Sequence, residues 1–281
     1  MPLTGTALVV GGGSGIGQET AFAFAEAGCK AVAIADINEN NAQKAAEQSK
    51  EYAVNPAYQS FSIKVDVVDE DSVQNMVDIA VKALGGRIDY FVNCAGAPNM
   101  SSFPISDLNT KHFDRVVRIN LYGTVNCMKA VSKAMQSQEP TSFIPETRRT
   151  SRHPERLLGR GSIVNLGSVN SIMANAGNMS YVTAKHAIVA ATKVAALDLA
   201  KDLIRVNVVL PGGTDTPMLT STIDRLPHFR QLLIDRTPLH RLASTDEIAN
   251  TIVHICSPGA SYMTGATVVI DGGLSLSAAR L

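Results

Sequence analysis

Short, wholly apolar runs alternate with longer amphipathic segments along nearly the whole chain, and this alternation constrains the fold more than any other feature. Parallel strands covered by helices on both faces read as continuous apolar runs, because neither face meets water. We therefore predict one α/β domain over residues 1–281, with a doubly wound, seven-stranded parallel sheet flanked by helices. The predicted strands are 7–10, 31–35, 61–65, 90–94, 162–166, 205–210 and 267–270. The predicted helices are about 18–27, 40–51, 71–84, 108–135, 181–201 and 245–257.

The composition describes a chain that buries a large apolar core and carries no excess charge. Hydrophobic residues make up 45% of the 281 residues, and 25 Lys+Arg balance 25 Asp+Glu. A nucleic-acid binder that works by counterion release needs a basic excess, and a disordered chain needs few apolar residues, so both classes are excluded. No uncharged apolar run reaches the roughly 18 residues that span a bilayer, so we expect no membrane partner.

The cysteines and the first residues indicate a reducing compartment. Cys29, Cys94, Cys127 and Cys256 lie far apart and lack the spacing of a zinc site, so we expect free thiols and no bound metal. No Lys or Arg precedes Lys30, and nothing there resembles a signal peptide. We therefore expect a soluble, cytoplasmic protein whose partner is a small molecule.

Two segments interrupt the alternation of strands and helices. Residues 136–160 contain three prolines and the basic clusters Arg148-Arg149 and Arg152-His153, with neither helical nor strand periodicity. We interpret this segment as a surface insertion and expect disorder or a mobile flap rather than an ordered functional element. Residues 212–241 carry three more prolines around short apolar patches, which predicts a short helical lid over a substrate.

The first predicted strand is joined to the first predicted helix by residues 11–17, which read GGGSGIG. Glycines let the chain turn sharply there and let backbone N–H groups approach a pyrophosphate at the helix N-terminus. Asp36 ends the second strand, nineteen residues beyond Gly17. A carboxylate at that place accepts both ribose hydroxyls of NAD and repels the extra phosphate of NADP. We therefore predict a dinucleotide site that favours NAD over NADP.

Further polar residues end the third and fourth predicted strands. Asp66 and Val67 follow the third strand, and residues 93–96 (NCAG) end the fourth. Ligands of open parallel sheets bind at the carboxyl ends of the strands, so both pieces fall on the same edge as the glycine turn.

Tyr181 and Lys185 are four residues apart on a predicted helix and therefore share one face. Such a pair arises by chance in many chains, so its partners decide its meaning. Ser168 lies thirteen residues before Tyr181, at the end of the fifth strand, and Asn120 lies in the long helix that precedes the insertion. Each of the four also has a plain structural interpretation, as a packed, capping or solvated side chain, but their joint placement on one edge favours catalysis.

With these pieces in place, the chain resembles the classical short-chain dehydrogenase/reductase family, whose fold is Rossmann-like, from about Thr6 to Gly273. The matching pieces are GGGSGIG at 11–17, Asp36, DV at 66–67, NCAG at 93–96, Asn120 within RINLYG, Ser168, YVTAK at 181–185, Pro211-Gly212 with Thr216, TG at 264–265 and DGG at 271–273. The resemblance implies cofactor contacts from Gly11, Ser14, Gly15, Ile16, Gly17, Asp36, Ile37, Asp66, Val67, Asn93, Ala95, Gly96, Tyr181, Lys185, Pro211, Gly212, Thr214 and Thr216.

The resemblance also implies roles for the four catalytic candidates. Tyr181 is expected to be the general acid/base, and Lys185 to bind the nicotinamide ribose and lower the pKa of Tyr181. Ser168 is expected to orient the substrate oxygen, and Asn120 to help hold a water-linked proton path. A free phenol titrates near pH 10, so a base that works near neutral pH needs a pKa lowered by about three units. The positive charges of Lys185 and of an oxidised nicotinamide are the expected causes.

Three positions depart from the family pattern. Val10 stands where the family usually has Thr, Gly167 where a second Ser is frequent, and Thr214 where Ile or Val is common. None of these departures removes a catalytic group.

We expect the substrate to bind between residues 168–180 and the lid. The predicted substrate contacts are Ser168, Asn170, Met173, Met179, Tyr181 and Met218. This set predicts a mainly apolar pocket, and no Arg or Lys occurs in 168–180, so an anionic substrate would need Arg225 or Arg230 from the lid. The sequence therefore predicts oxidation or reduction of a small, neutral secondary alcohol or ketone.

Two other functions remain open on the sequence alone. One is a non-catalytic dinucleotide-binding sensor or scaffold, which need not retain all four catalytic candidates. The other is an epimerase or dehydratase of the same family, which oxidises its substrate only transiently. The resemblance also implies a homo-oligomer, a tetramer or a dimer, and the alanine-rich helix 181–201 is compatible with one.

Overall fold

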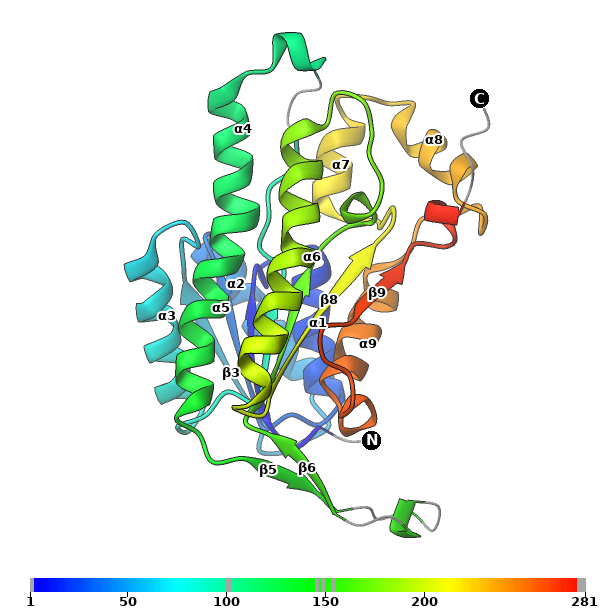
Figure 1. The fold of residues 1–281 in the computed structure, drawn as a ribbon. Coiled ribbons are helices and arrows are strands. Elements are labelled where there is room, and N and C mark those ends of the chain that lie inside the picture. The colour runs from blue at the N-terminus through cyan, green and yellow to red at the C-terminus, as the bar shows by residue number, and fades with distance from the viewer. Residues whose placement is uncertain (1–2, 100–102, 145–146, 148–149, 153–154, 277–281) are drawn as a thin grey trace.

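The computed structural model describes residues 3–99, 103–144, 147, 150–152 and 155–276 (Figure 1). Within these residues seven parallel strands form one sheet in the order β3-β2-β1-β4-β7-β8-β9. The predicted doubly wound sheet is therefore confirmed. The strands are β1 (Thr6–Val10), β2 (Ala31–Asp36), β3 (Gln59–Lys64), β4 (Tyr90–Asn93), β7 (Gly161–Leu166), β8 (Ile204–Pro211) and β9 (Thr267–Ile270).

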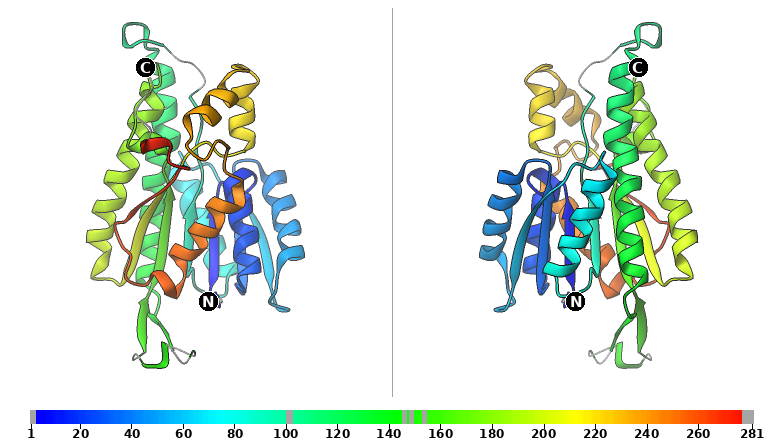
Figure 2. Two further views of the ribbon diagram at one scale, coloured as in Figure 1. Left: turned by 90° about the vertical axis from the view of Figure 1, so that its right-hand side faces the viewer. Right: turned by 90° about the vertical axis from the view of Figure 1, so that its left-hand side faces the viewer.

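Helices cover both faces of the sheet and close two apolar cores (Figure 2). The helices α1 (Gly15–Glu26), α2 (Glu39–Ser49) and α9 (Thr245–Cys256) share a core with alternate residues of β1, β2 and β7. The helices α3 (Glu70–Ala83), α5 (Gly123–Gln136) and α6 (Met179–Ala200) pack on the opposite face. Because both faces of the central strands are buried, β1 and β2 consist almost wholly of apolar residues, whereas the edge strand β3 keeps exposed polar side chains.

The predicted helix over 108–135 is interrupted. The structure has α4 (Thr110–Val117), a π-helical turn at Arg118–Tyr122 and then α5. The wide turn lets Gly123 donate its backbone N–H to the carbonyl of Arg118, five residues earlier. A side chain at Gly123 would lie 2.6 Å from Val67, so the helix can approach the loop after β3 only with glycine at this position.

The insertion at 136–160 contains regular structure that sequence analysis missed. Strands β5 (Thr141–Phe143) and β6 (Arg156–Gly159) pair antiparallel and project from the end of the sheet that lies opposite α7 and α8 (Figure 1). The expectation of disorder is wrong for these two strands, which are too short to show a period of two. The predicted basic residues Arg148, Arg149 and His153 lie outside the described residues.

The segment 212–241 folds into two short helices, α7 (Pro217–Ile223) and α8 (Phe229–Arg236), beyond the carboxyl ends of the strands (Figure 1). Thr216 begins α7, because its hydroxyl accepts a hydrogen bond from the N–H of Leu219 at 3.2 Å. Both helices consist of half-buried and exposed residues. None of the helices in the described part of the chain is both long and apolar enough to cross a membrane.

A buried glutamine fastens the base of the hairpin to the sheet. Gln138 is 6% exposed and accepts a hydrogen bond from the N–H of Ile88 at 2.7 Å. Its amide nitrogen donates to the carbonyls of Ile88, at 3.1 Å, and of Arg160, at 2.7 Å.

Replacing Gln138 by leucine leaves three backbone groups without their partner. We expect Gln138→Leu to lower the free energy of unfolding by about 3 kcal/mol, because buried unpaired polar groups are costly. Gln136→Leu is the matched control, since among the described residues the side chain of Gln136 bonds only to Asp202, in an exposed pair. Urea denaturation measures both variants, and an equal effect of the two would contradict this role of Gln138.

Candidate active site

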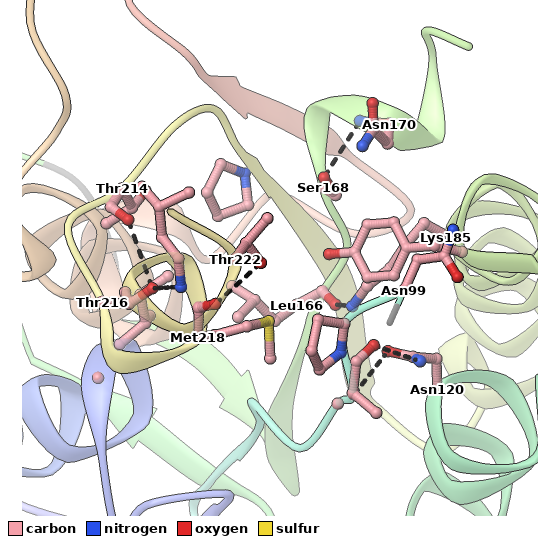
Figure 3. Close-up of a pocket in the computed structure, with 18 of the residues that line it drawn as sticks. Asn99, Asn120, Leu166, Ser168, Asn170, Lys185, Thr214, Thr216, Met218 and Thr222 are labelled. Atoms are coloured by element: carbon pink, nitrogen blue, oxygen red, sulfur yellow. Dashed lines mark hydrogen bonds between the residues drawn. The ribbon is translucent and has the colours of Figure 1, made fainter. Parts of the chain in front are cut away.

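A large cavity runs along the carboxyl edge of the sheet, from the glycine turn to helices α7 and α8. Figure 3 shows part of its wall. Its volume is about 2410 Å³. The strand order reverses between β1 and β4, and open α/β sheets bind ligands at such a point.

The glycine turn, which has few side chains, lies close to the start of the loop that follows β4. Gly11 has a φ of +72°, and a Cβ there would lie 2.6 Å from the backbone nitrogen of Ala95. A Cβ on Gly17 would overlap the carbonyl of Gly11. Helix α1 starts inside this turn, at Gly15, three residues earlier than predicted, and the side chain of Ser14 does not cap it. The turn therefore offers uncapped N–H groups to an anion, as a dinucleotide pyrophosphate requires.

Asp36 is held at the edge of the cavity by two backbone groups. Its Oδ2 accepts from the N–H of Gly13 at 2.9 Å, and its Oδ1 accepts from the N–H of Asn38 at 2.9 Å. A carboxylate has about four acceptor positions, so both oxygens can still accept hydroxyl groups. Ile37, Asp66 and Val67 line the same part of the cavity. These residues fit the adenosine half of a dinucleotide.

Two asparagines predicted at the site form hydrogen bonds within the protein. Asn93 does not line the cavity; it is 2% exposed and its side chain donates to the hydroxyl of Thr124 at 2.9 Å, so its cofactor contact stays a prediction. Asn120 reaches the cavity but is fully buried, and it donates to the carbonyls of Ala97, at 3.0 Å, and Val116, at 2.9 Å. The N–H of Ala97 returns a bond to Asn120 at 3.3 Å. The side chain of Asn120 therefore fixes the loop after β4.

Lys185 lies under Tyr181 on α6. Its Nζ donates to the carbonyl of Leu166 at 2.8 Å and lies 5.6 Å from the centroid of the Tyr181 ring. Lys185 is 4% exposed, and burial lowers its pKa to about 8. Burial raises the pKa of Tyr181, and a side-chain hydrogen bond with Ser168 acts in the opposite direction. The expected lowering of the pKa of Tyr181 is therefore not found in the chain by itself.

Ser168 stands at the end of β7 and starts a short 3₁₀ turn. Its hydroxyl accepts from the N–H of Asn170 at 3.1 Å, and its own N–H donates to the hydroxyl of Ser171 at 3.2 Å. A Cβ on Gly167 would overlap Leu210, so the neighbouring side chain occupies the space that a second serine would need.

Five of the six predicted substrate residues line the cavity, and one does not. Ser168, Asn170, Met173, Tyr181 and Met218 line the cavity, but Met179 does not. Met179 is exposed, and Thr183 one turn later donates to its sulfur at 3.7 Å. The first turn of a helix presents side chains in all directions, which a prediction from sequence distance does not resolve.

Most of the other predicted cofactor contacts also line the cavity. Gly11, Ser14, Gly15, Ile16 and Gly17 line the cavity together with Ala95, Gly96, Pro211, Gly212, Thr214 and Thr216. Thr214 donates to the carbonyl of Gly212 at 3.2 Å, and Thr216 donates to the carbonyl of Thr214 at 3.4 Å. Arg225 lines the cavity, whereas Arg230 pairs with Asp215 at 3.5 Å outside it.

Part of the cavity wall was not predicted from the sequence. Asn99, Lys111, Arg115 and Arg118 line the cavity without having been predicted, whereas Leu226 and Phe229 line it from the predicted lid 212–241. The signals were present: Asn99 follows β4 on the same edge as Ala95, and the three cations recur at helical spacing on α4 and the turn after it.

Comparisons with known proteins agree on one group of enzymes. A family model described as Enoyl-(Acyl carrier protein) reductase matches residues 10–275. The chain is 40% identical to "Short-chain dehydrogenase anuF" of Penicillium roqueforti over 276 residues, 98% of each chain. It is 33% identical to a 2,5-dichloro-2,5-cyclohexadiene-1,4-diol dehydrogenase of Sphingobium indicum, with 96% of each chain covered. The crystal structure of levodione reductase superposes with a TM-score of 0.86 at 29% identity, covering 99% of this chain and 100% of that one.

The buried ammonium of Lys185 predicts a pH-dependent stability. A pKa lowered from 10.5 to about 8 corresponds to about 3 kcal/mol, which the folded state loses while Lys185 is charged. Without cofactor, we expect Lys185→Met to be more stable than the natural chain below pH 8. The advantage shrinks as the pH rises from 8 to 10.5, because Lys185 becomes neutral in the folded state first.

Denaturant unfolding at a series of pH values measures this difference. Lys193→Met is the control, because Lys193 is exposed on the same helix and its removal should change little at any pH. A difference between natural chain and Lys185→Met that is constant from pH 7 to 10.5 would refute the lowered pKa.

Proposed function

Because the chain belongs to the classical short-chain dehydrogenase/reductase family and is thus an oxidoreductase, we propose that it interconverts a secondary alcohol and a ketone with NAD. The observation that carries the proposal is the wall formed by Ser168, Tyr181 and Lys185 at the end of β7 and the start of α6. All three line one cavity with the glycine turn, so a bound substrate and a bound dinucleotide would meet there.

Tyr181 is the general acid/base of this proposal. In the oxidative direction its phenolate takes the hydroxyl proton of the substrate, and in the reductive direction its hydroxyl returns that proton. NAD, when bound, accepts or supplies the hydride. Ser168 donates its hydroxyl to the substrate oxygen and so orients it toward Tyr181. The Ser168 hydroxyl accepts from the N–H of Asn170, and its own proton, which bonds to Tyr181 in this structure, would turn to the substrate oxygen once a substrate is bound.

Lys185 supplies the charge that this role of Tyr181 needs. Burial raises the pKa of Tyr181, so a phenolate near neutral pH requires a nearby cation. With a pKa of about 8, Lys185 is largely protonated at pH 7, 5.6 Å from the centre of the phenol ring. The carbonyl of Leu166 keeps the ammonium in this position.

Asp36 supports NAD rather than NADP as the cofactor. Both carboxylate oxygens are oriented by backbone N–H groups and keep free acceptor positions for the two ribose hydroxyls. A phosphate on one of those hydroxyls would meet a fixed negative charge instead.

We propose a small, mainly neutral and ring-bearing substrate, although Arg225 and three cations on α4 and the π-helical turn also line the cavity. Met173, Met218, Leu226 and Phe229 give the substrate end apolar walls that suit a flat carbon skeleton. Two relatives support this class, since one is named for a cyclohexadiene-1,4-diol and another for levodione.

A homo-oligomer, a tetramer or dimer, is the proposed assembly. Tyr122, Val125, Val194 and Leu197 are exposed apolar side chains on the outer surface of α5, α6 and the π-helical turn. Monomers rarely leave such a surface in water, so a second copy of the chain is its natural cover.

Removing the phenol hydroxyl tests the mechanism. We expect Tyr181→Phe to lower kcat by at least about 100-fold, the usual contribution of general acid/base catalysis, with the dissociation constant of NAD changed less than about threefold. Absorbance of NADH with a panel of cyclic alcohols and ketones measures turnover, and calorimetry measures NAD binding. Tyr262→Phe is the control, because that phenol is fully exposed. Unchanged turnover by Tyr181→Phe would exclude the mechanism, and NADH that never accumulates would favour an epimerase or dehydratase.

Removing the carboxylate tests the cofactor preference. We expect Asp36→Ser to raise kcat/KM for NADP at least about tenfold and to lower it for NAD, because repulsion and two acceptors disappear together. Glu39→Gln removes a nearby exposed acid on α2 and should leave the preference unchanged. If both variants shift the preference equally, general surface charge and not Asp36 sets it.

A further inference from the structure

A cluster of polar groups joins three segments of the chain beside Tyr181. It consists of Asn99 from the loop after β4, His112 from α4, Ser180 from the first turn of α6, and the carbonyl of Gly177. The Oδ1 of Asn99 lies 2.7 Å from Nε2 of His112 and 3.3 Å from the hydroxyl of Ser180. Its Nδ2 donates to the carbonyl of Gly177 at 3.4 Å. None of these residues has a role in the mechanism above.

The hydrogen bonds fix which way the Asn99 amide faces. The carbonyl of Gly177 can only accept, so the amide nitrogen of Asn99 must point toward it. The amide oxygen then faces His112 and Ser180, and both must donate to it. His112 therefore carries a proton on Nε2, whether the ring is neutral or charged.

In this arrangement one N–H group of the Asn99 side chain remains available as a hydrogen-bond donor. The amide nitrogen of Asn99 has two hydrogens, and within the described residues only the carbonyl of Gly177 accepts one of them. The amide oxygen already accepts two hydrogen bonds. Asn99 can therefore offer a ligand one N–H group and little acceptor capacity.

Asn99 is also placed where a substrate would reach it. It lines the cavity, on the side of Asn120 and Lys185 and across from Thr214, Thr216 and Met218 (Figure 3). Its partner Ser180 directly precedes Tyr181, so the position of the amide is coupled to that of the reacting phenol.

We propose that Asn99 determines specificity by donating its second amide N–H to a substrate oxygen other than the one that reacts. His112 is the positioning residue that holds the amide in this orientation. The preferred substrates are then neutral rings with two oxygen functions, one oxidised or reduced at Tyr181 and the other, a hydrogen-bond acceptor, at Asn99. This inference rests on the proposed function and adds the second point of recognition.

Cyclohexane-1,4-dione and cyclohexanone test the proposal, because they differ only in the second carbonyl. The measured quantity is the ratio of their kcat/KM values with NADH, after the dione value is halved for its two equivalent carbonyls. We expect Asn99→Leu to lower this ratio about tenfold, as one neutral hydrogen bond allows. The intrinsic reactivity of the two ketones is the same for every variant, so it cancels in the comparison.

Matched variants separate recognition from general damage. Asn175→Leu makes the same change at an amide of the same cavity that bonds to Asn170, and it should leave the ratio unchanged. His112→Leu should lower the ratio mainly through KM of the dione, and His112→Gln should restore it, because glutamine can still donate to Asn99. A purely structural role would affect both ketones equally and would move kcat as well.

A binding measurement separates this inference from the proposed function. Calorimetry gives the dissociation constants of both ketones for the NAD-loaded enzyme and for its Asn99→Leu variant. If neither ketone is reduced, the proposed activity on cyclic ketones fails, but tighter binding of the dione that is lost in Asn99→Leu still supports the role of Asn99. An equal ratio in the natural chain and Asn99→Leu, in turnover or in binding, overturns the inference.

Discussion

The hydrogen bond from the buried ammonium of Lys185 to the carbonyl of Leu166 sets the geometry on which the site depends. It joins α6 to the last residue of β7, so it fixes the register of the helix against the edge of the sheet. Tyr181 lies one turn before Lys185, and Ser168 lies two residues after Leu166. One bond therefore places the phenol and the serine hydroxyl relative to each other. Burial of the charge costs stability, and the proposed mechanism gives a reason for this cost, since it needs the cation beside the phenol.

Buried side-chain amides likewise fix the position of the loop that follows β4. Asn93 forms hydrogen bonds with Thr124 and with the loop residue Ala95. Asn120 forms hydrogen bonds with Val116 and with the loop residue Ala97. The π-helical turn at Arg118–Tyr122 makes this possible, since it shifts the helix where Asn120 must face the loop. Asn93 and Asn120, which the sequence placed at the site, thus fix the loop that forms part of its wall. Only some of the polar residues predicted from the sequence are positioned to touch a ligand.

The sequence predicted the sheet because strands buried on both faces leave continuous apolar runs, and all seven strands follow within two residues. It could not show the π-helical turn, because residues 108–135 keep an apolar stripe through it. It missed β5 and β6, whose few residues show no period and whose anchor, Gln138, depends on a contact fifty residues away. The site followed from the rule that parallel strands end on one edge. The directions of Asn93 and Met179 did not follow, because side-chain orientation is decided by packing. The roles of Ser168, Tyr181 and Lys185 stay predictions.

The two walls of the cavity differ in how firmly they are held, and this difference divides the work of recognition between them. The wall from the β4 loop, α4 and α6 is fixed by buried side chains such as Asn120 and Lys185. Helices α7 and α8, in contrast, contain no buried residue. A hydrogen bond discriminates only if its donor is held in place, whereas apolar contacts tolerate movement. Under the proposed function, the fixed wall would therefore recognise the oxygen atoms of a substrate, and α7 and α8 its carbon skeleton.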